Sequence, residues 1–99
     1  MTDSSRPYRL LREAQTDVTT AFDWYESQQS GLGFDFLRAG ADGIDAARRH
    51  PEHYPVLEAG IRRVLLRGFP YNVFFVTDET EMLVTNVTHA RRDPRRWRR

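Results

Sequence analysis

Apolar residues recur with a helical period in the first third of the chain. They fall at i, i+3, i+4 and i+7, on one face of a helix, at Val18, Ala21, Phe22 and Tyr25. Thr16 is typical of a helix N-cap, and Asp17 follows it at the positive end of the helix dipole, so we expect the helix to begin there. Gly31 is expected to end it.

A second helix is predicted from about Gly33 to Arg49, and Pro51 stops it because the residue before a proline avoids the helical region. Its apolar stripe consists of Phe36 or Leu37, Gly40, Ala41, Ile44 and Ala47. The small residues in this stripe allow another element to approach closely. Gly40 and Gly43 each lower the intrinsic stability of a helix by roughly 1 kcal/mol relative to alanine. We therefore expect tight packing to hold this helix.

The second half of the chain is rich in β-branched and aromatic residues, which favour strands. Three such runs, at residues 61–67, 71–77 and 82–89, are separated by short connections at residues 68–70 and 78–81. Connections this short make neighbouring strands antiparallel. Residues 8–11 add a short strand, which we expect at an edge of the sheet.

Alternation divides the run 61–67 into two faces. Ile61, Arg63, Leu65 and Arg67 share one face, and Arg62, Val64 and Leu66 share the other. The apolar face of the sheet needs a cover, and the two helices are the available cover. The predicted fold is therefore α+β, an antiparallel sheet packed against a two-helix hairpin in the order βααβββ. A chain of 99 residues fits one domain, 1–99.

Composition narrows the classes of function. The absence of cysteine excludes disulfides, thiolate zinc sites and cysteine nucleophiles. No apolar run is long enough to span a membrane, and residues 1–7 lack the apolar core of a signal peptide, so we expect a cytoplasmic protein. The histidines His50, His53 and His89 show no clustering in the sequence, so no metal is expected. No phosphate-binding glycine loop is present, and no cofactor is expected.

Positive charge is concentrated at the end of the chain. All 15 basic residues are arginines, and six of them lie among residues 91–99 beside a single acid, Asp93. This asymmetry indicates either an acidic or polyanionic partner or a solvated basic terminus. Guanidinium groups suit carboxylates and phosphates equally well, so the residue type does not choose between partners.

Five segments, in their order and spacing, resemble the RelE/ParE toxin superfamily of type II toxin–antitoxin (plasmid stabilisation) systems. They are Trp24-Tyr25-Glu26, Pro51, Arg62-Arg63, Phe69-Pro70-Tyr71 and Val87-Thr88-His89-Ala90-Arg91-Arg92-Asp93-Pro94. The resemblance extends from Tyr8 to Trp97. It implies an antiparallel sheet with a helical hairpin against it, and a cognate antitoxin encoded nearby. It also implies one of two activities, because RelE-like members cleave mRNA on the ribosome and ParE-like members poison DNA gyrase.

A metal-free ribonuclease needs a general base, a general acid and fixed positive charge around the phosphate. The residues that could provide these functions are His89, Arg63 and Arg91. The sequence departs from the RelE-like pattern at Leu65, Asn72 and Trp97, where that pattern has basic residues and a tyrosine. We therefore expect the ParE-like branch, which binds DNA gyrase without bond chemistry. The alternatives are a ribosome-dependent mRNA endonuclease and a toxin fold that survives only as a binding module.

The candidate site of a ParE-like toxin is a surface that binds partners. It comprises Arg62, Arg63, Arg67, Arg91, Arg92, Arg95, Arg96 and Trp97. At least one of Arg62, Arg63 and Arg67 is expected to extend over the core of the domain and not to contact a partner. His89 is expected to cap the sheet edge through a hydrogen bond. Trp97 either anchors the end of the chain on the domain or forms an interface hot spot.

Overall fold

The computed structural model describes residues 6–91, and its elements follow the predicted order. They are β1 (Tyr8–Leu10), α1 (Arg12–Gln28), α2 (Leu32–Arg49), the 3-10 turn η1 (Pro51–His53), β2 (Arg62–Leu65), β3 (Tyr71–Thr77) and β4 (Met82–His89). The bounds of α2 lie within one residue of the prediction, and Pro51 follows directly after its C-cap. Neither described helix is long and apolar enough to cross a membrane.

The four strands form one sheet in the order β1-β4-β3-β2. β2, β3 and β4 are antiparallel neighbours, which confirms the predicted meander. β1 pairs with β4 in the parallel sense, with Tyr8 opposite Met82 and Leu10 opposite Val84. The sheet is therefore mixed rather than wholly antiparallel. The helical hairpin carries the chain from one sheet edge to the other, and the three-strand meander then returns β4 to the side of β1.

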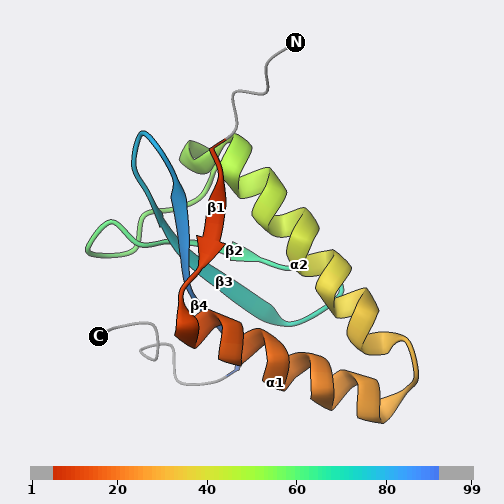
Figure 1. Cartoon of the computed structure of the whole chain (residues 1–99). Helices are drawn as coiled ribbons and strands as arrows, with labels where there is room; N and C mark the ends of the chain where they lie inside the picture. The colour runs from red at the N-terminus through yellow and green to blue at the C-terminus, as the bar shows by residue number, and fades with distance from the viewer. Residues whose placement is uncertain (1–5, 92–99) are drawn as a thin grey trace.

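The two helices form a hairpin against the sheet (Figure 1). α1 packs mainly against β4, and α2 lies against β2 and β3. Ala14, Ala21, Phe36, Ile44 and Ala47 of the helices meet Val64, Leu66, Tyr71, Val73, Phe75, Met82, Val84 and Val87 of the sheet side in one buried core. Burial of a single large side chain such as Phe36 contributes about 1.5–3 kcal/mol. Val64 and Leu66 are buried while Leu65 is exposed, which confirms the predicted faces of this strand.

Aromatic rings tie the hairpin to the sheet. The Tyr25 ring stacks on Phe36 with centroids 5.5 Å apart and meets Phe69 edge-on at 5.0 Å. Phe36 in turn meets Tyr71 of β3 at 5.1 Å. Such pairs add about 0.5–1.5 kcal/mol beyond the burial of their area. Tyr25 packs against the core, as its place on the predicted apolar face implied, and its neighbour Trp24 is exposed.

The start of α1 differs from the prediction. The helix begins at Arg12, so Thr16 lies inside it and is not the N-cap. Leu11 occupies the cap position, and its N–H donates to the Val84 carbonyl at 2.9 Å, so β1 leads directly into the first helical turn. Asp17 is not in the first turn, and its carboxylate accepts a hydrogen bond from the Val87 N–H. Asp17, which the sequence pattern placed in the first turn of the helix, thus forms a hydrogen bond with a distant strand instead.

Glu26 holds the turn between the helices. α1 ends at Gln28, and Gly31 adopts a φ of 94°, in the left-handed region that favours glycine. The Glu26 carboxylate accepts hydrogen bonds from the N–H groups of Gly31 and Gly33, each at 2.8 Å. These amides belong to the start of α2, where the helix itself offers no acceptor. A side chain from α1 therefore caps α2.

Close packing of α2 occurs at Gly33 and Gly43. A Cβ atom on Gly33 would lie 2.8 Å from the Phe22 carbonyl oxygen, and one on Gly43 would lie 2.8 Å from Leu66 Cδ2. At Gly40 a Cβ would meet nothing within 4 Å, and Ala41 is exposed. Of the three small residues in the predicted stripe, Ala47 is buried as expected, whereas the expected close approach is wrong for Gly40 and Ala41, and the contact at Gly43 lies outside the stripe. Gly40 and Ala41 line a small apolar groove of about 150 Å³ instead.

Candidate partner-binding surface

β2 leaves part of the sheet edge open. It is the last strand of the sheet, and an isolated bridge between Val56 and Arg62 covers only its first residue. Leu66 donates to the Tyr71 carbonyl on the β3 side. Because alternate amides along a strand point to opposite edges, the N–H groups of residues 63 and 65 point away from β3, and only that of residue 65 lies clear of the bridge to Val56. No described strand pairs with them, and such an edge is a template for an added strand.

The side chains along β2 and the residues after it fall into two groups, those that contact the rest of the fold and those that are exposed. Arg62 is half-buried, and its guanidinium donates a hydrogen bond to the Tyr54 carbonyl at 2.6 Å. Arg62 is thus the strand arginine that extends over the fold, as expected for at least one of the three. Arg63 and Arg67 are exposed, and Leu65 between them is 59% exposed. An exposed leucine flanked by two guanidinium groups suits a partner that is both apolar and acidic.

A groove of about 490 Å³ lies between α2 and this strand. It is lined by Asp35, Arg38, Ala39, Asp42, Gly43 and Ala46 of α2, by Val64, Leu65, Leu66 and Arg67, and by Tyr54 and Phe69. Arg38 forms an ion pair with Asp35. The open edge and the groove are adjacent, so one extended segment could take backbone hydrogen bonds from the edge and bury side chains in the groove. We call residues 63–67 and this groove the β2 surface.

His89 lies at the end of β4, opposite Tyr71 and two strands away from β2. A cavity of about 420 Å³ is lined there by Thr20, Ala21, Trp24, Tyr25, Pro70, Tyr71 and His89. The imidazole meets the Tyr71 ring edge-on at 5.2 Å, and its Nδ1 accepts a hydrogen bond from the Arg91 N–H at 3.1 Å. A neutral His89 therefore carries its proton on Nε2. These contacts agree with the expected role of a cap at the sheet end.

Tyr25 borders the same cavity but is a poor proton acceptor. Burial, and to a smaller extent the neighbouring Tyr71, raises the pKa of the Tyr25 hydroxyl above its ordinary value. The hydroxyl therefore stays protonated at neutral pH. It can donate a hydrogen bond in the cavity, but it offers no phenolate as a base.

The three residues named for nuclease chemistry do not converge. His89 stands opposite Tyr71 on the face of the sheet that the helices cover. Arg63 stands opposite Phe74, which alternates with core residues of β3 and so faces the other side. Arg91 is exposed beyond the end of β4. A phosphate held by Arg63 would thus be separated from the His89 imidazole by the sheet itself.

The remaining candidates, Arg92, Arg95, Arg96 and Trp97, lie outside the described residues. Their proposed contacts with a partner, and the alternative that Trp97 anchors the chain end, stay predictions from the sequence. Arg91 is the last described residue and is exposed. Its backbone N–H is the donor to His89.

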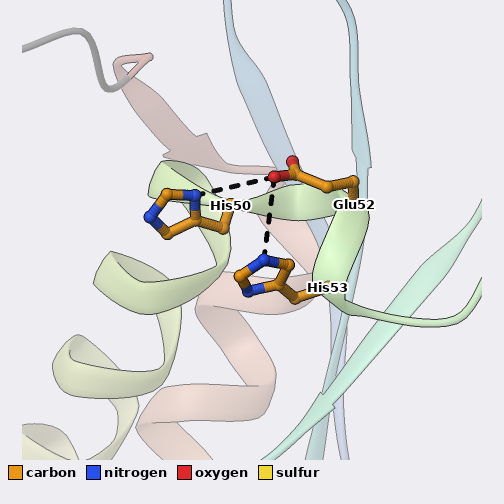
Figure 2. A group of neighbouring side chains, drawn as sticks. All are labelled: His50, Glu52 and His53. Carbon is orange, nitrogen blue, oxygen red and sulfur yellow. Dashed lines mark ion pairs between the residues drawn. The ribbon is translucent and has the colours of Figure 1, made fainter.

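One group of side chains was missed by the sequence reasoning (Figure 2). His50, Glu52 and His53 are all exposed, and their potential ligand atoms lie within 4.8 Å of one another. The expectation that the histidines do not cluster is therefore wrong for His50 and His53. The spacing His-Pro-Glu-His could have indicated the group, because residues three apart eclipse one another on a 3-10 turn.

Comparison with solved structures shows a likeness in fold. The chain superposes on a solved structure described as a chromosomal ParDE TA (toxin–antitoxin) system from P. aeruginosa, with a TM-score of 0.74 and 13% sequence identity. The match covers 87% of this chain and 97% of that chain. No protein-family model matches this chain, and no curated protein matches it by sequence. At this sequence identity, the likeness shows a shared fold and does not relate individual functional residues of the two chains.

The fold is therefore ParE-like, in agreement with the fold that the resemblance implied. The α+β arrangement of a helical hairpin on a four-strand mixed sheet is shared over nearly the full length of the matched chain.

Proposed function

We propose that this chain is the toxin of a type II toxin–antitoxin system, that it inhibits DNA gyrase in the cytoplasm, and that a cognate antitoxin neutralises it. The observation that carries the proposal is the ParE-like fold, shared with a chain of a ParDE system over 87% of this sequence. The name of that structure describes a toxin–antitoxin pair, and gyrase poisoning is the activity of the ParE-like branch that the sequence resembles.

The placement of the nuclease candidates favours binding over mRNA cleavage. A general base and the charge that stabilises the transition state must both reach the same phosphate. His89 and Arg63 lie on opposite faces of the sheet, and Tyr25 stays protonated. Leu65 and Asn72 stand where a RelE-like toxin would have basic residues. An mRNA endonuclease that uses His89, Arg63 and Arg91 remains the second candidate.

The β2 surface is our proposed site for the antitoxin. An extended segment that adds to residues 63–65 would pair with the outward backbone groups of this edge. Leu65 would contact its apolar side chains, and Arg63 and Arg67 would pair with its carboxylates. Arg91 and the residues Arg92, Arg95, Arg96 and Trp97 would extend the positive surface toward the antitoxin or toward gyrase. Arg62 is not part of this contact because its guanidinium is used within the fold.

Pulse labelling in a bacterial host tests the proposal. The chain is induced without an antitoxin, and DNA and protein synthesis are followed over the first minutes. We expect DNA synthesis to fall first, together with a DNA-damage response. An earlier fall in protein synthesis would favour the endonuclease, and the matched variants His89→Ala and Arg63→Ala would then test its chemistry. If neither synthesis falls, the fold serves here only as a binding module.

A further inference from the structure

A fixed backbone presents the side chains of His50 and His53. His50 is the C-cap of α2, and the buried Pro51 starts η1. The His53 N–H donates to the His50 carbonyl at 3.0 Å, and the Tyr54 N–H donates to the Pro51 carbonyl at 3.1 Å. A 3-10 turn repeats every three residues, so both imidazoles project from the same side. Their rings stack with centroids 4.8 Å apart and an interplanar angle of 15°.

Glu52 adds a carboxylate to the two imidazoles. Its Oε2 atom lies 3.6 Å from Nδ1 of His50 and 3.9 Å from Nε2 of His53 (Figure 2). Two imidazole nitrogens and one carboxylate oxygen form a donor set that zinc uses in proteins.

We propose that His50, Glu52 and His53 bind one Zn²⁺ ion, with water in the fourth position. Zinc lies about 2.0–2.2 Å from nitrogen and oxygen ligands, so the ligand atoms of a tetrahedral site are roughly 3.3–3.6 Å apart. The three potential ligand atoms here already lie within 4.8 Å of one another. The side chains of His50, Glu52 and His53 are 60%, 65% and 66% exposed, so rotation of their terminal bonds can close the site.

The surroundings favour a cation at this point. The carboxyl end of the 18-residue α2 carries the negative end of the helix dipole. Arg48 and Arg49 in the last turn both pair with Asp45 at 3.0 Å, so the Asp45 carboxylate offsets one of their two positive charges. Imidazole nitrogens also select zinc over the hard cations Mg²⁺ and Ca²⁺, which prefer oxygen ligands. The bound ion would link the end of α2 to η1 and stabilise the native chain through binding.

Calorimetric titration of the full chain with ZnCl2, after removal of any histidine tag, tests the site. We expect one ion per chain, a rise in melting temperature, and shifts of the His50 and His53 ring signals in NMR spectra with no shift of His89. Loss of even an outer-shell partner weakens metal binding by roughly 10- to 100-fold. His50→Ala and His53→Ala, which remove ligands, should therefore weaken it at least as much, and Glu52→Gln should also weaken it.

The matched control is His89→Ala, which removes the third histidine and should bind zinc like the unchanged chain. MgCl2 at the same concentration should produce no ring shift. Because all three proposed ligands are exposed, their variants should keep the circular dichroism spectrum of the folded chain. The proposal is overturned if the unchanged chain takes up no zinc. It is equally overturned if His50→Ala and His53→Ala bind zinc as tightly as the unchanged chain, or if His89 is the residue that responds.

Discussion

The Asp17 carboxylate accepts a hydrogen bond from the Val87 N–H at 2.9 Å, across 70 residues of sequence. β1 accompanies β4 only as far as Val84. Further along, Ala90 donates to Pro70 on the β3 side, so the Val87 amide, three positions earlier, points toward the side that β1 no longer covers. A side chain of α1 thus replaces the missing strand and fixes the helix on the sheet.

Removal of this acceptor should destabilise the fold. Asp17→Ala leaves a partly buried amide unpaired, and we expect it to lower the free energy of unfolding by about 1–3 kcal/mol. Asp17→Asn keeps a side-chain oxygen and should lose less. Asp23→Ala, which removes an exposed acid of the same helix, should stay within about 0.5 kcal/mol of the unchanged chain. Urea unfolding measures all three. Equal stability of Asp17→Ala and Asp23→Ala would show that the contact contributes nothing to folding.

Two glycines of α2 should respond to alanine in opposite directions. Gly33→Ala places a Cβ 2.8 Å from the Phe22 carbonyl oxygen, and such crowding typically costs about 1–3 kcal/mol. Gly40→Ala meets nothing within 4 Å and should raise the stability by about 0.5–1 kcal/mol through helix propensity. Melting temperatures of the two variants provide the comparison. Stabilisation by both substitutions would contradict the close approach of α1 and α2 at Gly33.

Asp78 should make the stability depend on acid pH. The N–H groups of Thr80 and Glu81 and the Thr80 hydroxyl donate to its carboxylate, which holds the pKa of Asp78 below its ordinary value. A lowered folded-state pKa contributes stability above the unfolded value, near 3.9, and this stability is lost as the pH falls through the folded value. The urea midpoint of Asp78→Ala should therefore lie below that of the unchanged chain at pH 7.

The same difference should shrink as the pH falls below about 3.9, where the carboxyl of the unfolded chain is protonated. Midpoints measured at several pH values, with Glu79→Ala as a neighbouring control, follow this change. A difference that stays constant from pH 7 to the acid limit would show that the ionised carboxylate has no part in holding the β3–β4 turn.

The antitoxin should lose affinity when the β2 surface is altered. Leu65 is 59% exposed, so Leu65→Asp should leave the fold intact and place a negative charge where an acidic partner approaches. We expect at least a tenfold weaker complex, equivalent to about 1.4 kcal/mol. Leu37→Asp changes a leucine of α2 that is 38% exposed and borders the other groove, and it serves as the control. Equal affinities of the two variants in a co-purification and calorimetry assay would place the antitoxin elsewhere.

Hydrophobic periodicity predicts the helices and strands of this fold, but it does not predict all of the contacts and pairings between them. Both the period of α2 and the alternation along β2 are local; the alternation is confirmed, and the stripe of α2 is confirmed at Phe36, Ile44 and Ala47. The start of α1 is wrong because Thr16 and Asp17 have the residue types of a cap, while Leu11 is held by Val84 on a distant strand. The parallel pairing of β1 with β4 also joins segments more than 70 positions apart, and no local pattern encodes it.

In the candidate site as well, the sequence predicts some features, while others depend on the three-dimensional arrangement. Arg62 and Arg63 are adjacent in sequence, yet one donates to the Tyr54 carbonyl and the other is exposed, because alternation turns them to opposite faces. His50 and His53 look dispersed in the sequence and meet only because η1 brings residues three apart together. The roles expected for Arg92, Arg95, Arg96 and Trp97 lie beyond the described residues and rest on the sequence.

The most direct test of the central claim uses purified components. DNA gyrase, ATP and relaxed plasmid are incubated with increasing amounts of the chain, and supercoiled and cleaved DNA are separated by electrophoresis. The account predicts that supercoiling falls and that cleaved plasmid accumulates, and that prior addition of the cognate antitoxin prevents both. Unchanged supercoiling at a large excess of folded chain, together with cleavage of mRNA on added ribosomes, would contradict it.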